Sequence, residues 1–413
     1  MIRINNVRII DKYIDRTDDV LIEGEKILLI GKEKIDEKLA GMHPEILSEK
    51  DLEEKGIAQK PNGSCAEAFE NDKLLVLSGE GRYLSPSFVD LHFHLRNPGQ
   101  EYKQTFEEAS AACIRGGYTK VVAMANTKPT ADSPEVLDAV AEGMKDLPLE
   151  VIQTSAVTIG LKGEETVDFE KMRKKTFVFS DDGRNVDSVE ILEKALEKSK
   201  ELDFIIMDHD EPESDMVIRN IEVARKTGGR LHFCHISEKR SIDAIVKAKQ
   251  DGLNVTFEVS PHHIFSSDLS YRVNPPIGTA EDNQAILSAV KNGQVDAIAT
   301  DHAPHTQEDK EKGAPGIANI ETAFGMIRKV FSGCDIPLQT QIALMSNAPS
   351  EILGVDNRIR EGARADLVLY NDEEYKIDST SFVTRSKNTP YDGWEAKGII
   401  EYTFAGGKLY KNR

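Results

Sequence analysis

The sequence predicts an α/β protein, a (β/α)8 (TIM) barrel with a small composite β domain built from the N- and C-terminal segments. Three observations lead to this prediction. Eight apolar, β-branched runs of strand length lie between residues 84 and 305, amphipathic helical patterns separate them, and short β patterns occur near both chain ends. A barrel of this type needs about 250 residues, so the 413 residues leave room for the additional domain.

The eight runs end in polar residues at intervals of 24 to 40 residues, at His94, Asn126, Thr158, Asp182, His209, His235, Pro261 and Asp301. Patterns such as SVEILEKALEKSKEL, with apolar residues three and four apart, separate them and are typical of amphipathic helices. The alternative is an open doubly wound sheet, which usually has a glycine-rich phosphate loop after its first strand. Here the first strand is followed by HFHLRNPG instead, which favours the barrel.

Short alternating patterns at the chain ends predict the second domain. MIRINNVRII and DVLIEGEKILLIGK precede the barrel, and RADLVLYND and GIIEYTFAGGKLYKN follow it. We therefore expect residues 1–83 and 356–413 to form one small β domain beside a barrel of residues 84–355, because chain termini often lie close together. The acidic segment 36–75, with the loop signal PNGSC, is predicted to be a solvent-exposed insertion without a chemical role.

Charge and composition exclude several classes of function. With 52 Lys and Arg against 71 Asp and Glu, the formal net charge is −19, so bulk electrostatics attract neither nucleic acid nor an anionic membrane. The N-terminus has no apolar signal region, and no run approaches the ~18 apolar residues of a membrane helix. The four cysteines form no CxxC pair that would indicate a zinc knuckle. We expect a cytoplasmic protein.

Histidines mark a candidate metal site, because nine of the ten lie in the barrel segment, mostly at strand ends, where such barrels place their active face. Two of them, spaced two residues apart on the first strand, share one face. Together with the polar ends of the fourth, fifth, sixth and eighth strands they make six candidate ligands: His92, His94, Asp182, His209, His235 and Asp301. Imidazole and carboxylate suit zinc. Six ligands exceed the need of one tetrahedral ion, which predicts a binuclear site bridged by a carboxylate and a hydroxide.

A resemblance to a known family rests on motifs that follow one another through residues 76–413: VDLHFHLRNPG, MANTKPTADS, FVFSDDG, HISEKRSIDAI, NVTFEVSPHH, NPP, ATDHAPHT and KNTPYDG. In their order and spacing they resemble the dihydroorotases of the amidohydrolase superfamily, specifically the bacterial-type class with DDG at the fourth strand. The resemblance implies a zinc-dependent cyclic amide hydrolase of pyrimidine biosynthesis. Such an enzyme interconverts L-dihydroorotate and N-carbamoyl-L-aspartate through a bridging hydroxide.

The resemblance also implies individual roles for the ligand residues. His92 and His94 would hold the more buried of two zinc ions, His209 and His235 the more exposed one, and Asp182 would bridge them. Asp301 would be both a ligand of the first metal and the general base. As partners, the resemblance admits a homodimer and a contact with aspartate transcarbamoylase.

Further positions match the family's substrate contacts. Arg96 resembles the carboxylate-binding arginine, and a guanidinium suits a carboxylate because it donates two parallel hydrogen bonds. Asn126, Asn274 and His305 resemble other contacts, and backbone groups near Pro315 and Gly316 would close over the ring. The asparagine amides offer the donor and acceptor that a cyclic imide edge needs, although each could equally cap a turn. We expect His262, His263, His302 and Cys234 to be structural.

Two alternatives stay open. Hydantoinases and allantoinases share the barrel but bridge their metals with a carboxylated lysine, whereas Asp182 stands at that position here and Lys174 and Lys175 precede the strand. A non-catalytic scaffold for aspartate transcarbamoylase would have lost ligands, and all six are present. The segment HDEPESD makes the loop after His209 shorter than is usual in the family, and this puts site closure in doubt.

Overall fold

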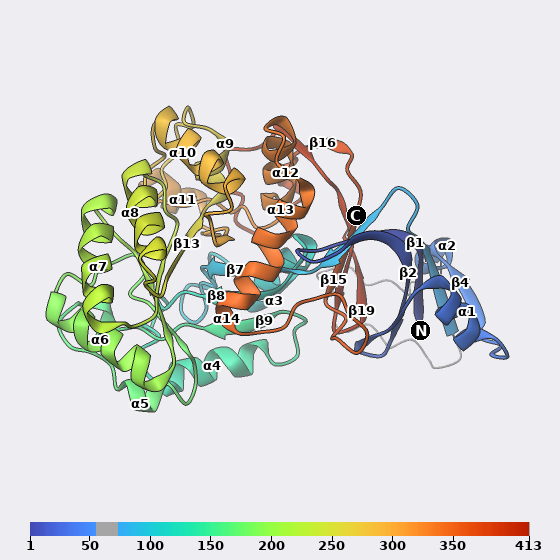
Figure 1. Cartoon of the computed structure of the whole chain (residues 1–413), viewed down its shortest axis with the longest axis horizontal. Helices are drawn as coiled ribbons and strands as arrows, with labels where there is room; N and C mark the ends of the chain where they lie inside the picture. The colour runs from blue at the N-terminus through green and yellow to red at the C-terminus, as the bar shows by residue number, and fades with distance from the viewer. Residues whose placement is uncertain (55–72, 413) are drawn as a thin grey trace.

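Eight parallel strands form the centre of the larger domain. The computed structural model describes residues 1–54 and 73–412. Eight strands run in chain order: β7 (Phe88–Phe93), β8 (Tyr118–Ala123), β9 (Glu150–Gln153), β10 (Val178–Phe179), β11 (Ile205–Asp208), β12 (Leu231–Phe233), β13 (Val255–Val259) and β14 (Ala297–Ile298). Neighbouring strands pair in parallel within two sheets, and the bridges Ser155–Phe179 and Phe93–His302 join the sheets at both seams. The strands and helices are those of the predicted α/β barrel (Figure 1).

Helices follow the strands and cover their outer side, as Figure 1 shows for α4 to α8. Those of the first six units are α3 (Phe106–Arg115), α4 (Pro134–Met144), α5 (Phe169–Met172), α6 (Val189–Leu202), α7 (Glu213–Thr227) and α8 (Lys239–Gln250). Later come α9 (Pro261–Phe265), α10 (Ala280–Lys291), α11 (Gln307–Glu311), α12 (Ala323–Gly333), α13 (Leu338–Ile342) and α14 (Ala348–Leu353). Capping boxes at Thr105, Thr279 and Thr306 fix the starts of α3, α10 and α11.

Two apolar clusters hold the barrel together. The larger lies between strands and helices, where α6 contributes Leu192, Ala195 and Leu196. The second combines side chains from non-adjacent strands, including Leu91 of β7 and Met207 of β11, and therefore fills the barrel interior. The interior is closed by packed apolar side chains at one end, so polar chemistry is confined to the carboxyl ends of the strands.

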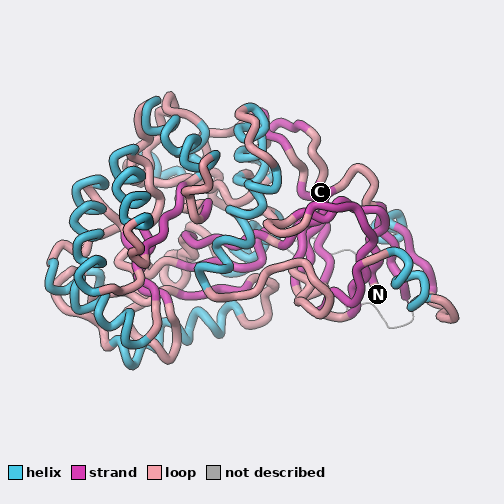
Figure 2. The backbone as a smooth tube through the Cα atoms, in the orientation of Figure 1, coloured by secondary structure: helices cyan, strands magenta, loops and turns pink. Residues whose placement is uncertain are grey.

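Strands from both chain ends share one nine-stranded sheet (Figure 2). Its N-terminal members are β1 (Ile2–Ile10), β2 (Asp15–Glu23), β3 (Lys26–Ile30), β4 (Glu45–Ser48), β5 (Lys73–Ser78) and β6 (Tyr83–Pro86). Its C-terminal members are β15 (Leu367–Tyr370), β18 (Ile400–Ala405) and β19 (Lys408–Lys411), and β15 pairs antiparallel with β6. The hairpin β16 (Glu374–Lys376) and β17 (Glu395–Lys397) forms a separate sheet that contacts α12. The domain boundaries at residues 83 and 355 stay a prediction.

The expected insertion at 36–75 is only partly a surface excursion. Helix α1 (Lys32–Leu39) and helix α2 (Glu49–Glu54) flank β4, and β4 pairs in parallel with β5. Leu47 and Leu52 are buried in the apolar cluster of the sheet, so the prediction of a solvated insertion was wrong for this part. A four-residue strand with one buried side chain leaves too short an alternation to be recognised. The PNGSC loop lies outside the described residues.

Among the described helices, none combines the length and the apolar character needed to cross a membrane.

Leu47 and Ile46 offer a matched test of the β4 assignment, because Leu47 is 1% exposed and Ile46 is 69% exposed on the same strand. Replacing a buried leucine by alanine removes apolar contacts and leaves a cavity, so Leu47→Ala should lower the free energy of unfolding by about 2–4 kcal/mol. Ile46→Ala should change it by less than about 0.5 kcal/mol. Urea denaturation followed by circular dichroism measures both, and equal effects would contradict the assignment.

Candidate metal centre and substrate cavity

The six predicted ligands come together at the carboxyl ends of five barrel strands. His92 lies in β7 and His94 follows it, while the others follow β10, β11, β12 and β14. All six side chains are buried, and five of them, together with Gly183 and Ala303, line one cavity of about 210 Å³. His92 lies beneath this cavity and is fully buried.

Asp182 is the centre of the cluster. Its Oδ1 lies 3.1 Å from His92 Nε2, 3.5 Å from His209 Nδ1 and 3.8 Å from His235 Nε2. Its Oδ2 lies 3.7 Å from His94 Nε2. Two groups of possible metal ligands therefore share this one carboxylate, the first with His92 and His94 and the second with His209 and His235.

Buried imidazole nitrogens support a metal-binding interpretation. His92 Nδ1, His92 Nε2 and His235 Nδ1 have no hydrogen-bond partner of suitable geometry among the described residues. Buried polar atoms are otherwise almost always hydrogen-bonded. His209 Nδ1 and His235 Nε2 converge to 3.0 Å, so two nitrogen atoms point to the same place. Neutral imidazoles and carboxylates of this kind fit a divalent ion such as zinc.

Asn126 orients His94. The amide donates from Nδ2 to Asp182 Oδ2 at 3.0 Å, which leaves Asn126 Oδ1 as an acceptor 3.1 Å from His94 Nδ1. Because this oxygen can only accept, the ring proton of a neutral His94 lies on Nδ1 and the Nε2 lone pair faces the acidic cluster. Asn126, predicted to contact substrate, therefore also selects the tautomer that a metal ligand requires.

Asp301 faces the same cluster from the end of β14. Its Oδ1 lies 3.1 Å from His94 Nε2, and its Oδ2 lies 3.9 Å from His262 Nε2. Burial alone would raise the pKa of Asp301, but the nearby imidazoles of His94, His92 and His262 hold it below its ordinary value. Burial likewise opposes ionisation of Asp182, whose pKa is held low by His92, His209 and His235. Both carboxylates are thus anionic acceptors.

The backbone turns sharply at three of these positions. Arg96, His235 and Asp301 have φ values of 67°, 39° and 48°, a region that non-glycine residues rarely adopt. Each lies two or three residues after the end of a barrel strand. Such conformations persist only where surrounding contacts impose them, and they concentrate at functional sites.

Cations gather on one side of the cavity. Arg96 Nη2 lies 3.1 Å from His305 Nε2, and Arg96 Nε donates to the carbonyl of Pro304 at 3.1 Å. Lys103 Nζ lies 3.2 Å from His305 Nδ1. Burial lowers the pKa of Arg96 to about 10, opposed by Asp301 and Asp182, so its guanidinium keeps its charge at neutral pH. An anionic group in the cavity would be attracted to this side, because Arg96 and Lys103 carry positive charge.

The remaining predicted contacts complete the wall. Asn274 Nδ2 donates to Glu211 Oε2 at 3.1 Å and lies 3.5 Å from His209 Nε2. Pro315 and Gly316 line the cavity, and their contact with substrate stays a prediction. Helix α7 begins at Glu213, so the loop after His209 is short. In this arrangement Asn274 is tied to that short loop.

Three contributors were missed by the sequence analysis. Asn388 accepts from the backbone N–H of His305 at 2.9 Å and donates to the carbonyls of Ala303 and Gly316, so it ties two cavity segments together. Lys310 donates to the carbonyls of Ala314 and Gly316. Glu258 lies beneath the site, with Oε1 3.3 Å from His92 Nδ1. Only Glu258, an acid within the apolar run NVTFEV, left a signal in the sequence.

The residues expected to be structural behave differently from one another. His302 Nε2 contacts Gln104 Oε1 at 3.0 Å and its Nδ1 accepts from two backbone amides, while His263 Nε2 contacts the carbonyl of Pro275. Cys234 is buried and belongs to the interior apolar cluster. His262 has no hydrogen-bond partner among the described residues, contrary to expectation, because its ring faces Asp301 instead.

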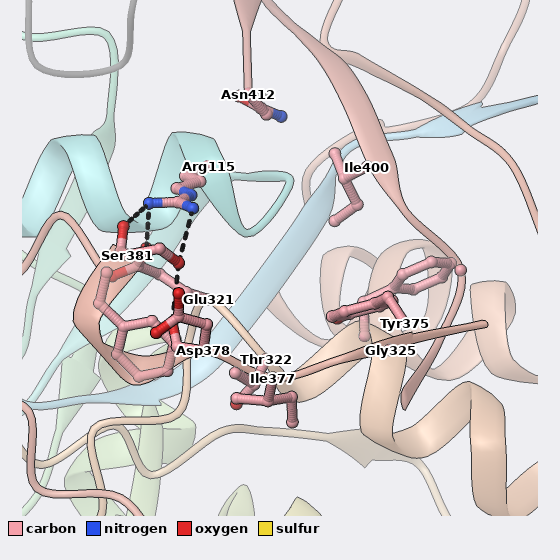
Figure 3. A pocket seen from close by; sticks show the side chains of 13 residues that line it. Arg115, Glu321, Thr322, Gly325, Tyr375, Ile377, Asp378, Ser381, Ile400 and Asn412 are labelled. Carbon is pink, nitrogen blue, oxygen red and sulfur yellow. Dashed lines mark hydrogen bonds and ion pairs between the residues drawn. The ribbon is translucent and has the colours of Figure 1, made fainter. Parts of the chain in front are cut away.

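A second pocket lies away from this site, where α3, α12 and the C-terminal hairpin meet (Figure 3). Arg115 Nη1 lies 3.4 Å from Glu321 Oε2, and Glu321 accepts from the backbone N–H of Val383. Burial raises the pKa of Glu321 to about 7, opposed by Arg115. These contacts attach the C-terminal segment to the barrel, which is a structural role.

Comparison with known proteins shows which family this chain resembles in sequence. Residues 81–237 match the family model described as dihydro-orotase-like. A dihydroorotase of Clostridium botulinum (strain Eklund 17B / Type B) is 39% identical over 363 residues, covering 83% of this chain and 91% of the relative. One of Caldanaerobacter subterraneus is 37% identical over 377 residues, covering 81% and 88%.

Solved structures share the fold. The L-hydantoinase from Arthrobacter aurescens superimposes with a TM-score of 0.81 at 19% identity, covering all of this chain and 96% of that one. The dihydropyrimidinase from Brevibacillus agri NCHU1002 gives a TM-score of 0.80 at 19% identity, covering 99% and 95%. At such identity the likeness concerns the fold alone. The sequence relatives establish the family: this chain belongs to the dihydroorotase family of cyclic amide hydrolases.

Proposed function

We propose that this protein catalyses the reversible ring opening of L-dihydroorotate to N-carbamoyl-L-aspartate, a step of pyrimidine biosynthesis in the cytoplasm. The observation that carries the proposal is one cavity with two unlike sides. An acidic and imidazole cluster around Asp182 lies on one side, and the pair Arg96–His305 lies on the other. A cyclic amide with a carboxylate substituent would match both sides. Its reactive carbonyl would face the acidic and imidazole cluster, and its carboxylate would face Arg96 and His305.

We infer that two zinc ions occupy the cluster. His92 and His94 would hold one, His209 and His235 the other, Asp182 would bridge them, and Asp301 would be a further ligand of the first. The shared carboxylate supports this assignment, as do the nitrogens of His92 and His235 that make no hydrogen bond of suitable geometry among the described residues. Bound there, such ions supply water activation at neutral pH and polarise the carbonyl of the substrate.

Asp301 is the proposed proton carrier. Opening of the ring adds a water oxygen to the carbonyl carbon and breaks the C–N bond, while a proton must travel from the water to the leaving nitrogen. Asp301 lies on the cavity wall, is ionised, and is therefore able to accept that proton and deliver it. In the direction of ring closure the same carboxylate carries the proton back.

The substrate's carboxylate would lie against Arg96 and His305. The amides of Asn126 and Asn274 would contact the ring's polar edge, and backbone groups of Pro315 and Gly316 would cover it from the opposite wall. Among the described residues, Arg96 is the arginine that lines this cavity, and its planar guanidinium can donate two hydrogen bonds to a carboxylate. Homodimer formation and a contact with aspartate transcarbamoylase stay predictions.

A hydantoinase-like activity is the alternative that the shared fold raises. The expected difference is the bridging group, which in hydantoinases is a carboxylated lysine. Here Asp182 lies at the centre of the ligand cluster, and Lys175 pairs with Asp138 at 2.7 Å on the outer side of the barrel. The other alternative is a non-catalytic scaffold that has lost its metal-ligating residues. It is disfavoured, because all six candidate ligand side chains are present and converge.

The substrate assignment is tested by ring-opening assays. Protein loaded with zinc, its metal content determined by elemental analysis, should bind about two zinc ions per chain. It should turn over L-dihydroorotate, followed by the loss of ultraviolet absorbance, much faster than hydantoin or dihydrouracil. The physical reason is the cationic side of the cavity, for which neutral rings have no partner. Turnover of hydantoin or dihydrouracil without turnover of L-dihydroorotate would contradict the substrate assignment. Failure to bind zinc would favour the non-catalytic scaffold.

Asp301→Asn tests the proton carrier. The amide keeps the size of the side chain but cannot accept a proton, so kcat should fall by well over about 10²-fold, because general acid–base help is commonly worth ~10²–10⁴. Zinc content should fall only partly. The matched control is Asp187→Asn, an exposed residue that is not among those lining the cavity and should leave kcat unchanged. Near-normal activity of Asp301→Asn would place the base elsewhere.

Arg96→Met tests the carboxylate subsite. It should raise KM for L-dihydroorotate by at least about tenfold, because a charge-assisted hydrogen bond is commonly worth ~1.5–3 kcal/mol. Zinc content should not change, since guanidinium is no ligand. Arg96→Lys should restore affinity only partly, because a point charge cannot donate the paired bonds. Arg184→Met, at an exposed arginine that is not among the residues lining the cavity, is the control. An unaltered KM in Arg96→Met would show that the carboxylate binds elsewhere.

A further inference from the structure

Both ring nitrogens of one histidine face a cation. His305 Nε2 lies 3.1 Å from Arg96 Nη2, and His305 Nδ1 lies 3.2 Å from Lys103 Nζ. All three side chains are less than a tenth exposed. Lys103 is held in place through its backbone, since its N–H donates to Gln100 and its carbonyl accepts from Ser386 Oγ at 2.7 Å.

The donors outnumber the acceptors in this arrangement. A guanidinium and an ammonium only donate, whereas a neutral imidazole has one acceptor nitrogen and one N–H. Protonation of the ring is opposed, because burial and the neighbouring charges of Arg96 and Lys103 lower the pKa of His305 to about 2. One of the two contacts therefore sets an N–H against an N–H, so the three side chains lack one acceptor among themselves. The nearby carboxylate oxygen, Asp309 Oδ2, lies 3.8 Å from His305 Nδ1, which is beyond hydrogen-bonding distance.

The position of the cavity decides which contact is satisfied. Arg96 and His305 line it, so the Arg96 N–H groups can turn to water or to a ligand there. Lys103 does not line it and stands behind His305, where its other nearby acceptor is Asp309 Oδ2 at 3.5 Å. An ammonium with so few acceptors takes the His305 Nδ1 lone pair, which leaves the ring proton on Nε2, facing the cavity.

We propose that Lys103 is the positioning residue that makes this enzyme specific for anionic cyclic amides. By donating to His305 Nδ1 it fixes the proton on Nε2, so that His305 and Arg96 present adjacent donors to the same carboxylate. The bound carboxylate supplies the acceptor that the group lacks. This role rests on the proposed function, which supplies the anionic substrate. Lys103 lies outside the cavity, yet it would determine whether the enzyme prefers a ring with a carboxylate to a neutral ring.

Kinetics of the full-length, zinc-loaded protein provide the first test. Lys103→Met should raise KM for L-dihydroorotate about tenfold and change kcat less than about threefold, because a charge-assisted contact is lost from binding and not from the chemical step. Lys103→Gln should raise KM only about threefold, since its amide can still donate to Nδ1. Lys128→Met is the control, an exposed lysine near Lys103 that is not among the described partners of His305.

A double-mutant cycle separates this role from a merely structural one. In a His305→Asn background, Lys103→Met should raise KM by less than about twofold, because Lys103 acts through the imidazole. An undiminished tenfold effect in that background would overturn the proposal, as would a loss confined to kcat.

The tautomer itself is measurable without turnover. Nitrogen-15 spectra of histidine-labelled protein, with His305 identified by its absence in His305→Asn, should show the ring proton on Nε2 in the wild type and on Nδ1 in Lys103→Met. The same tautomer in both proteins would refute the role of Lys103. Absence of ring opening in the wild type would instead refute the proposed substrate, while the spectra would still decide the tautomer.

Discussion

The active face depends on one buried carboxylate. Asp182 lies within 3.8 Å of ring nitrogens from His92, His94, His209 and His235. A buried anion is costly unless positive charge or hydrogen-bond donors compensate it. Four histidines from three strands must therefore keep their register around this single side chain. The interior apolar layer beneath it supplies the rigidity, because packed strands transmit small displacements directly to the ligands.

Charge is divided within the cavity. The chain as a whole carries a formal charge of −19, which does not favour the approach of an anion. Arg96 nevertheless lines one side of the cavity, with the buried Lys103 behind it against His305, and Asp301 and Asp182 line the other side. Because buried charges are weakly screened, this local field outweighs the distant surface charge. The division between an anion-binding wall and an acidic, metal-fitting wall gives the cavity an orientation for its ligand.

The C-terminal segment belongs to the site as much as the barrel does. Asn388 holds the backbone of His305 and the carbonyls of Ala303 and Gly316, and Ser386 holds the carbonyl of Lys103. The pairing of β15 with β6 and the contact of Arg115 with Glu321 anchor this segment on either side. The composite sheet therefore stabilises the cavity wall although it contributes no ligand.

The sequence alone determined the barrel, the family and the six residues that converge at the candidate metal centre, because these leave local signals. Strand-length apolar runs end in a polar residue, and the pair His92–His94 shares a face by strand periodicity. Only the tertiary structure decided which nitrogen of His94 is free and that β4 joins the sheet. It also decided that His305 is contacted by Lys103, early in the barrel, and by Asn388 of the C-terminal segment. Contacts between residues separated by tens or hundreds of positions leave no pattern along the chain. They are set by the closure of the barrel and by the packing of the chain ends against it.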